Sequence, residues 1–509
     1  MNRERATQSK IRWDPVTGEI NDSRNGDYLW SCVNVGEAVS VVMTPFTYSF
    51  GHNCFSQFDL IPGISFTGNI GGRVYANRSL ERMIQRSFGK LADNLKISTK
   101  ELAGDADDPI DPAEQSLKLS KSVLLGKVMP KSLSMIAKHV WKARNVPGFI
   151  AGNPSWCRTM AGRIENIKTR EEMATIWTKE INPYVLRAFH RVIATALRFG
   201  ILSGKLRPVL GDMVGSADTD VLLTNANRNG EFLESLGPVV GLSRVANGKM
   251  PRDVYLDTWG HRGVLEIEAA AARPFEEDGW LDRELNAYNA SKVDVDELLS
   301  KKYSDYEDAW QRLQMRYPRR AKGLIRRLEQ CAAANRARES VRSEFIRLVW
   351  VMRSWARKSG VLAEIGDDAF FLTVEELLEI LSGKDESTSY IPARKKTYER
   401  YKALPPYPPA ISGPFDPFQW AKNLGQCDEC SDSGEKSGKF AAVLSGNSII
   451  TGVPGSAGEA VGTVRLLRSL EEGDQLVDGE ILVTSATNIG WTLLFPRVAA
   501  IVTDIGASL

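Results

Sequence analysis

A change in composition between residues 402 and 447 divides this chain of 509 residues into two parts of different character. The segment contains the proline-rich run LPPYPPAISGPFDP and the small polar run DECSDSGEKSGK. Because proline lacks a backbone N–H and resists helix formation, we interpret residues 402–447 as an extended linker between domains. The chain length, which suits about two to four domains, agrees with this division.

The first part of the chain is expected to form one α-rich domain over residues 28–401, preceded by a polar N-terminal arm at 1–27. Residues 28–89 are rich in glycine and aromatic side chains, with a turn expected at Thr44–Phe46, and they favour short strands over long helices. From about residue 115 to 380 the sequence has helical periodicity, which makes helix the main structure of this domain.

Two helices of this domain can be predicted in detail. Over Arg336–Lys358, apolar side chains recur at spacings of three and four, which predicts one buried helix face, and Gly360 is expected to end the helix. Thr373 and Glu376 have the spacing of a capping box, in which each side chain accepts a hydrogen bond from the other residue's backbone N–H. Another helix is therefore expected to begin at Thr373.

The last part of the chain, residues 448–509, has the pattern of an α/β unit. Three short β-branched runs, at 461–467, 480–484 and 498–503, are separated by glycine and aspartate turns. Their consecutive apolar residues are typical of strands buried on both faces of a sheet. Because the sequence stops soon after the third run, the unit is expected to be incomplete. The predicted fold class is multidomain α+β, a mainly α-helical domain followed by an incomplete α/β domain.

The overall charge and composition limit the classes of partner. The 65 Lys and Arg residues nearly balance the 63 Asp and Glu residues, leaving +2, so nucleic acid and anionic membranes are not expected as partners. The sequence has no run of about 18 apolar residues that would predict a membrane span, and the charged N-terminus lacks the apolar region of a secretory signal. The six cysteines are sparse, which favours a reducing cytoplasm.

Cys427 and Cys430 form a CxxC pair within the segment interpreted as a linker. Such thiols can bind a metal or act as a redox pair. The alternative is two thiols in a flexible segment, because a zinc site needs about four ligands and neither a second CxxC nor a histidine is nearby.

The segment DTWGHRGVLEIE contains the candidate binding residues of the first part. His261 and Arg262 lie between two glycines that allow tight backbone geometry, and Glu266 and Glu268 follow within a few residues. An arginine in such a loop is suited to bidentate capture of a carboxylate or phosphate. The alternative is a structural network of arginine and glutamate, and the residues alone leave both interpretations open.

Several nucleotide and catalytic motifs are absent from the sequence. It contains no GxxxxGK[ST] phosphate loop, no GxGxxG opening a helix after a strand, no HExxH and no GxSxG. Independent nucleotide binding through a P-loop or a Rossmann fold is therefore not expected.

The terminal unit resembles the swivelling phosphohistidine domain of the phosphoenolpyruvate-utilising enzymes. The resemblance lies in GVPGSAGEAVGTVRLL, DGEILVTSATNIGWTLLF and AAIVTDIGASL, and the matching motif positions are Thr487, Gly490, Trp491, Thr503 and Gly506. The sequence departs from the family pattern at Asn488, Ile489 and Leu493, where Asp, Pro and Pro are preferred, and at Ala507, where glycine is frequent. The phosphorylated histidine of the family would be expected just beyond Leu509, so the resemblance implies no catalytic histidine within this chain.

The first part resembles the substrate-binding domain of phosphoenolpyruvate-synthase-like and rifampicin phosphotransferase-like enzymes. The matching blocks are WSCVNVGEAVSVVMTPFTYS, GGRVYANRS, WGHRGVLEIE, ARESVRSEFIRLVWVMR and GDDAFFLTVEEL. In those relatives an ATP-grasp-like domain precedes the substrate domain, whereas this chain opens at the substrate domain. The resemblance therefore implies that ATP and Mg²⁺ bind a missing or separate module and that this chain binds no cofactor itself.

The resemblance implies a phosphotransferase whose phosphohistidine carries a phosphoryl group from ATP to a small-molecule substrate in the α-rich domain. Arg262 would supply positive charge, His261 would act as a base and Glu266 would orient them, while Thr487 and Thr503 would shape the histidine turn. The expected partners are the small-molecule substrate and an ATP-grasp-type module. The alternatives are a noncatalytic ligand-binding or scaffold protein and a ligase that activates a carboxylate by phosphorylation.

Overall fold

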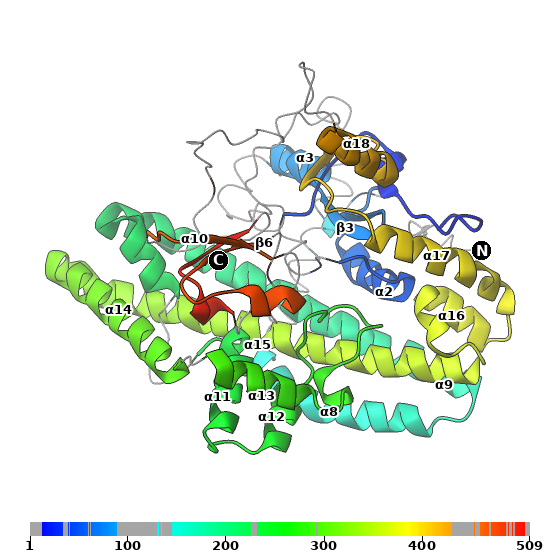
Figure 1. Cartoon of the computed structure of the whole chain (residues 1–509), viewed down its shortest axis with the longest axis horizontal. Coiled ribbons are helices and arrows are strands. Elements are labelled where there is room, and N and C mark those ends of the chain that lie inside the picture. The colour runs from blue at the N-terminus through cyan, green and yellow to red at the C-terminus, as the bar shows by residue number, and fades with distance from the viewer. Residues whose placement is uncertain are drawn as a thin grey trace.

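The computed structural model describes the chain in segments, which are mostly helical and include two small sheets (Figure 1). This mixture agrees with the α+β class expected from the sequence. The described residues are 13–33, 39, 41–59, 61, 63–88, 130, 131, 134, 145–224, 232–291, 294–429, 452, 459–467, 470–484, 487, 491 and 494–503.

Two long helices, α10 (Asn182–Thr224) and α15 (Pro318–Leu362), pack along each other and form the axis of the α-rich part. Figure 1 shows α14 beside them and the group α11, α12 and α13 together. The bounds of the other helices are α2 Pro45–Phe55, α3 Arg78–Phe88, α8 Val146–Asn166, α9 Arg170–Ile176, α11 Gly237–Ala246, α12 Arg252–Trp259, α13 Trp280–Ser291, α14 Val295–Arg316, α16 Val374–Leu381, α17 Ile391–Lys402 and α18 Pro417–Glu429.

Both predicted helices are present, but only one of the two predicted ends is correct. The predicted helix lies within α15, and its apolar stripe packs in the main core, with Leu348 and Met352 fully buried and Phe345 half-buried. The helix continues to Leu362, past Gly360, so the predicted end is wrong by two residues. Gly360 allows a close approach within the fold instead, since a Cβ there would meet the carbonyl oxygen of Gly366. The capping box of Thr373 and Glu376 is confirmed at the start of α16.

A four-stranded antiparallel sheet of order β2-β3-β1-β4 lies in the first part. Its strands are β1 Leu29–Ser31, β2 Thr67–Ile70, β3 Arg73–Asn77 and β4 Ala410–Ser412. The strands between residues 28 and 89 agree with the sequence, but the turn expected at Thr44–Phe46 is wrong. Thr44 is the N-cap of α2, its side chain accepts a hydrogen bond from Thr47 N, and Pro45 occupies the first turn, where its missing N–H costs nothing.

Part of the segment interpreted as a linker is packed against the first part. Strand β4 pairs with β1, and Ile411, at its centre, is buried. The Tyr407 hydroxyl donates to the carbonyl of Gly71 at 3.1 Å, and α18 follows. Residues 402–429 thus differ from the extended tether expected, because alternating apolar residues among the prolines can be buried at a sheet edge. Cys430, half of the CxxC pair, lies outside the described residues.

A second sheet is parallel, with order β5-β6-β7, and its strands Val464–Leu466, Ile481–Thr484 and Ala500–Thr503 lie within the three predicted runs. One face is buried beneath Leu476, Trp491 and Leu494. The opposite face differs from the expectation of burial on both sides, since Val464 is 60% exposed and Val502 is 51% exposed. Among the described helices, none is both long and apolar enough to cross a bilayer.

Candidate functional site

The candidate loop, residues 260–276, leaves the end of α12 at a position fixed by α15. Arg347 of α15 donates to the carbonyl oxygens of Asp257 and Thr258 at 2.9 and 2.8 Å, and these are two of the last carbonyls of α12. Its guanidinium also pairs with Glu344 at 3.1 Å. A cation at a helix C-terminus satisfies carbonyls that have no partner within the helix. The start of the loop is therefore held by a buried arginine on another helix.

His261, the first candidate residue, is completely buried. Its Nε2 lies 3.1 Å from both the carbonyl oxygen and the hydroxyl of Ser343, and its Nδ1 has no hydrogen-bond partner among the described residues. Burial, followed by the nearby cations Arg347 and Arg262, lowers the pKa of His261 well below its usual value. The imidazole is therefore neutral.

Arg262 and Glu266 form an ion pair within the loop. The guanidinium Nε donates to Glu266 Oε1, and the two residues are only 6% and 9% exposed. The arginine–glutamate pairing considered from the sequence is thus present. Contact between Arg262 and a ligand stays a prediction, because the Arg262 side chain is buried whereas its neighbours Val264 and Leu265 are exposed.

Glu268 joins the loop to the beginning of α2. Its carboxylate accepts hydrogen bonds from Thr44 N at 2.9 Å, Thr44 Oγ1 at 2.7 Å and Thr47 Oγ1 at 2.6 Å. It also accepts from Ala270 N at 2.8 Å. A carboxylate at a helix N-terminus is stabilised by the free N–H groups and by the helix dipole. Glu268 therefore caps α2 from outside the helix.

Two further arginines hold the rest of the loop. Arg273 is 1% exposed and donates to the carbonyls of Glu266 and Glu268 at 2.8 Å each. Burial, together with neighbouring Arg353, lowers the pKa of Arg273 to about 10. Arg353, from α15, pairs with Glu276 at 2.8 Å and donates to the carbonyl of Ala270 at 2.7 Å. The loop is consequently fixed by buried charges from both its own residues and α15.

Several members of this buried network are not among the predicted site residues. Arg347, Glu344 and Arg353 lie in α15 and are between 6% and 8% exposed. Within a helical pattern a charged residue indicates a solvent-facing side, and no local signal separates that case from a helix surrounded by other elements. For Arg273 the sequence does give a signal, because Arg273-Pro274 follows the WGHRGVLEIE block that resembles the related enzymes.

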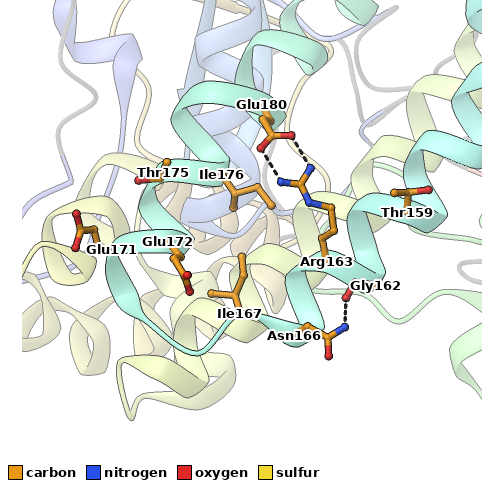
Figure 2. Close-up of a pocket in the computed structure, with 10 residues that line it drawn as sticks. All are labelled: Thr159, Gly162, Arg163, Asn166, Ile167, Glu171, Glu172, Thr175, Ile176 and Glu180. Atoms are coloured by element: carbon orange, nitrogen blue, oxygen red, sulfur yellow. Dashed lines mark hydrogen bonds and ion pairs between the residues drawn. The ribbon is translucent and has the colours of Figure 1, made fainter.

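A surface hollow of about 840 Å³ lies elsewhere, between α8 and α9 (Figure 2). Arg163 and Glu180 face each other across it in a bidentate pair of 2.6 and 2.8 Å. Glu180 belongs to a π-helical turn, Trp177–Ile181, that follows α9. The predicted site residues do not line this hollow, whose walls are formed by Thr159, Gly162, Arg163, Asn166, Ile167, Glu171, Glu172, Thr175, Ile176 and Glu180.

The predicted motif residues of the terminal unit have different environments. Trp491 is 4% exposed and belongs to the core beneath the parallel sheet. Thr503 ends β7 and is paired in register with Thr484, while Thr487 is half-buried. Gly490 and Gly506 lie outside the described residues. Within the described ranges, no group of three or more His, Cys, Asp or Glu residues is arranged to hold a metal ion.

Comparison with known proteins gives partial matches, and no protein-family model matches the chain. An uncharacterized protein of Mycobacterium tuberculosis is 31% identical over 180 residues, which are 34% of this chain and 18% of the relative. A rifampicin phosphotransferase of Bacillus cereus is 32% identical over 149 residues, 29% of this chain and 15% of the relative. A rifampicin phosphotransferase of Streptomyces sviceus is 27% identical over 286 residues, 52% of this chain and 30% of the relative.

The chain covers less than a third of the length of these curated relatives. The matches support a relationship to the phosphoenolpyruvate-utilising, rifampicin phosphotransferase-like enzymes. At the level of that family they suggest phosphotransferase activity.

Replacing Glu268 by glutamine should lower the free energy of unfolding by about 3 kcal/mol, because the amide places a donor against the donors at the start of α2. Urea titration measures the change. Glu277→Gln is the matched control, since Glu277 pairs with Arg283 at the surface, and it should cost less than about 1 kcal/mol. Equal costs for the two variants would contradict a capping role for Glu268.

Arg262→Ala leaves the Glu266 carboxylate buried without a cation, so we expect the free energy of unfolding to fall by about 3 kcal/mol or more. The double variant Arg262→Ala/Glu266→Ala should recover part of this loss. Arg283→Ala, which breaks a surface pair, serves as the control. A cost for Arg262→Ala no greater than that of the control would favour the ligand-binding interpretation of Arg262.

The depressed pKa of His261 predicts acid sensitivity. Above about pH 6.5 the imidazole is neutral in both states, and as the pH falls below this value the unfolded chain binds a proton that the folded chain does not. His261 should therefore contribute a loss of stability of up to about 1.4 kcal/mol per pH unit. Urea titrations at pH 7, 6 and 5 give the free energy of unfolding at each pH. This free energy should fall less with decreasing pH in His261→Gln than in the unaltered chain, and an identical fall in both would refute the prediction.

Proposed function

We propose that this chain is the substrate-holding part of a phosphotransferase, together with part of a swivelling phosphohistidine domain. The observation that carries the proposal is the 286-residue match to the Streptomyces sviceus rifampicin phosphotransferase. A match of 286 residues is far longer than the unit at 448–509, so the similarity includes the α-rich part. The parallel sheet at the predicted strand positions agrees with an α/β carrier domain.

In the proposed reaction, a histidine of the carrier domain receives the β-phosphoryl group of ATP, which is bound with Mg²⁺ on a separate module. AMP is the leaving group, and the γ-phosphoryl group passes to water and is released as inorganic phosphate. The N–P bond then breaks as an oxygen of the acceptor forms its bond to phosphorus, and the acceptor proton passes to a base. This chain would hold the acceptor in the α-rich part, where orientation and positive charge lower the barrier.

The buried loop defines what its residues can contribute to this reaction. Neutral His261 has the protonation state of a base, but it is buried against Ser343. Arg262 is already paired with Glu266, so its charge would reach a phosphoryl group only if the phosphoryl oxygens replace that carboxylate. The proposed roles of Arg262 as cation and of Glu266 as its orienting partner therefore require such an exchange.

Two alternatives belong to different classes. A noncatalytic ligand-binding or scaffold protein would retain the helical part without phosphotransfer. A ligase would use the same phosphohistidine to activate a carboxylate for capture by an amine. The extent of the match to rifampicin phosphotransferases favours the phosphotransferase.

The test is phosphoryl transfer by the complete gene product, with rifampicin as the first acceptor because the relatives carry that name. The chain of 509 residues alone should form no AMP from ATP and Mg²⁺. The product of the full reading frame, incubated with β-³²P-labelled ATP, should carry acid-labile, base-stable phosphate on histidine. AMP formation by the chain alone, or a complete gene product without this label, would contradict the proposal.

A further inference from the structure

Two half-buried aromatic rings lie face to face on neighbouring helices. Trp156 of α8 and Tyr184 of α10 have ring centroids 3.7 Å apart and an interplanar angle of 5°. Both pack against the edge of the main core. A stacked pair of this kind presents a broad, rigid aromatic surface.

Two arginines follow Tyr184 at successive turns of α10, and neither pairs with a carboxylate among the described residues. Arg187 is exposed, with its guanidinium carbon 5.7 Å from the Tyr184 ring centroid. Arg191 is half-buried, with its guanidinium carbon 5.0 Å from the Phe149 ring centroid. Because they are three and four positions apart, Tyr184, Arg187 and Arg191 lie on one side of α10.

Arg191 lacks the carboxylate partner that several buried arginines of this protein have among the described residues. Its Nη1 reaches the carbonyl of Arg187 at 3.3 Å, whereas its Nε is buried without a hydrogen-bond partner among the described residues. By contrast, Arg262, Arg347 and Arg353 are each paired with a glutamate. A partly desolvated cation without an anion costs free energy, and an anionic ligand would remove that cost.

The aromatic surface is held in place by a buried polar chain. The Tyr184 hydroxyl donates to Asn153 Oδ1 at 3.1 Å, and Asn153 Nδ2 donates to Glu344 Oε2 at 2.7 Å. Glu344 in turn pairs with Arg347, which caps α12. Because the Tyr184 hydroxyl is engaged on the inner side, the orientation of its ring is fixed before a ligand arrives.

We propose that Trp156, Tyr184, Arg187 and Arg191 form a binding surface for a small aromatic molecule that carries an oxyanion. The aromatic ring of the ligand packs against the Trp156–Tyr184 pair, and its phosphate or carboxylate accepts hydrogen bonds from the two guanidinium groups. This surface does not depend on the proposed phosphotransfer, because it involves neither the candidate loop nor the terminal unit.

The experiment is isothermal titration calorimetry of the full chain with 1-naphthyl phosphate, compared with inorganic phosphate and with 1-naphthol. We expect 1-naphthyl phosphate to bind at least tenfold more tightly than either part alone. Arg191→Met and Trp156→Leu should each weaken binding about tenfold or more, because each removes one of the two elements. Arg198→Met, which removes an exposed arginine further along the same helix, should change the affinity less than twofold.

Thermal unfolding gives a second readout for Arg191. A cation held for a ligand contributes little to the fold, so Arg191→Met should leave the melting temperature unchanged or raise it. The proposal is overturned if 1-naphthyl phosphate does not bind saturably, if inorganic phosphate binds equally well, or if Arg198→Met weakens binding as much as Arg191→Met. A melting temperature several degrees lower for Arg191→Met would assign this arginine to the fold and also overturn the proposal.

Discussion

The carboxylate of Glu268 connects two parts of the chain that are 224 residues apart, and the α-rich part depends on this connection. It accepts hydrogen bonds at the N-terminus of α2, where backbone N–H groups have no partner within the helix. Helix α2 then carries Phe46 into the main core, where its ring contacts Trp355 and Phe370. A buried charge is tolerated there because its acceptor positions are filled by hydroxyl and N–H donors.

The elements predicted correctly are those whose signals are local. Thr373 and Glu376 are three residues apart, and the capping box needs nothing beyond that spacing. The three strands of the terminal unit likewise follow from short apolar runs between turns. Helix α2 was missed because its sequence, PFTYSFGHNCF, is rich in aromatic residues and contains a proline and a glycine, all of which favour strand or turn. Its cap from Glu268 and its burial outweigh these preferences, and neither can be seen in the local sequence.

In the candidate loop, too, the sequence predicts what depends on nearby residues and not what depends on distant ones. The sequence places His261, Arg262 and Glu266 close together, and the ion pair of Arg262 with Glu266 agrees with one of the two interpretations that the residues left open. The depth of these side chains could not be predicted, because it is set by Ser343, Arg347 and Arg353 of α15. An arginine beside glycines can equally serve an exposed ligand or a buried carboxylate. Only the helix packed over it distinguishes these cases, and that helix lies more than 80 residues away, since His261 and Ser343 are 82 positions apart.

The two faces of the parallel sheet are both apolar, but only one of them is buried. The residues beneath it come from both connections, Leu476 between β5 and β6, and Trp491 and Leu494 between β6 and β7, so both connections cover the same face. Right-handed crossovers between strands in sequential order give this arrangement. The opposite face carries Val464, Leu466 and Val502 and is just as apolar, but each of these three residues is more than half exposed. Strand composition therefore identifies surfaces that can be buried, whereas the order of the strands determines which of them their own connections can cover.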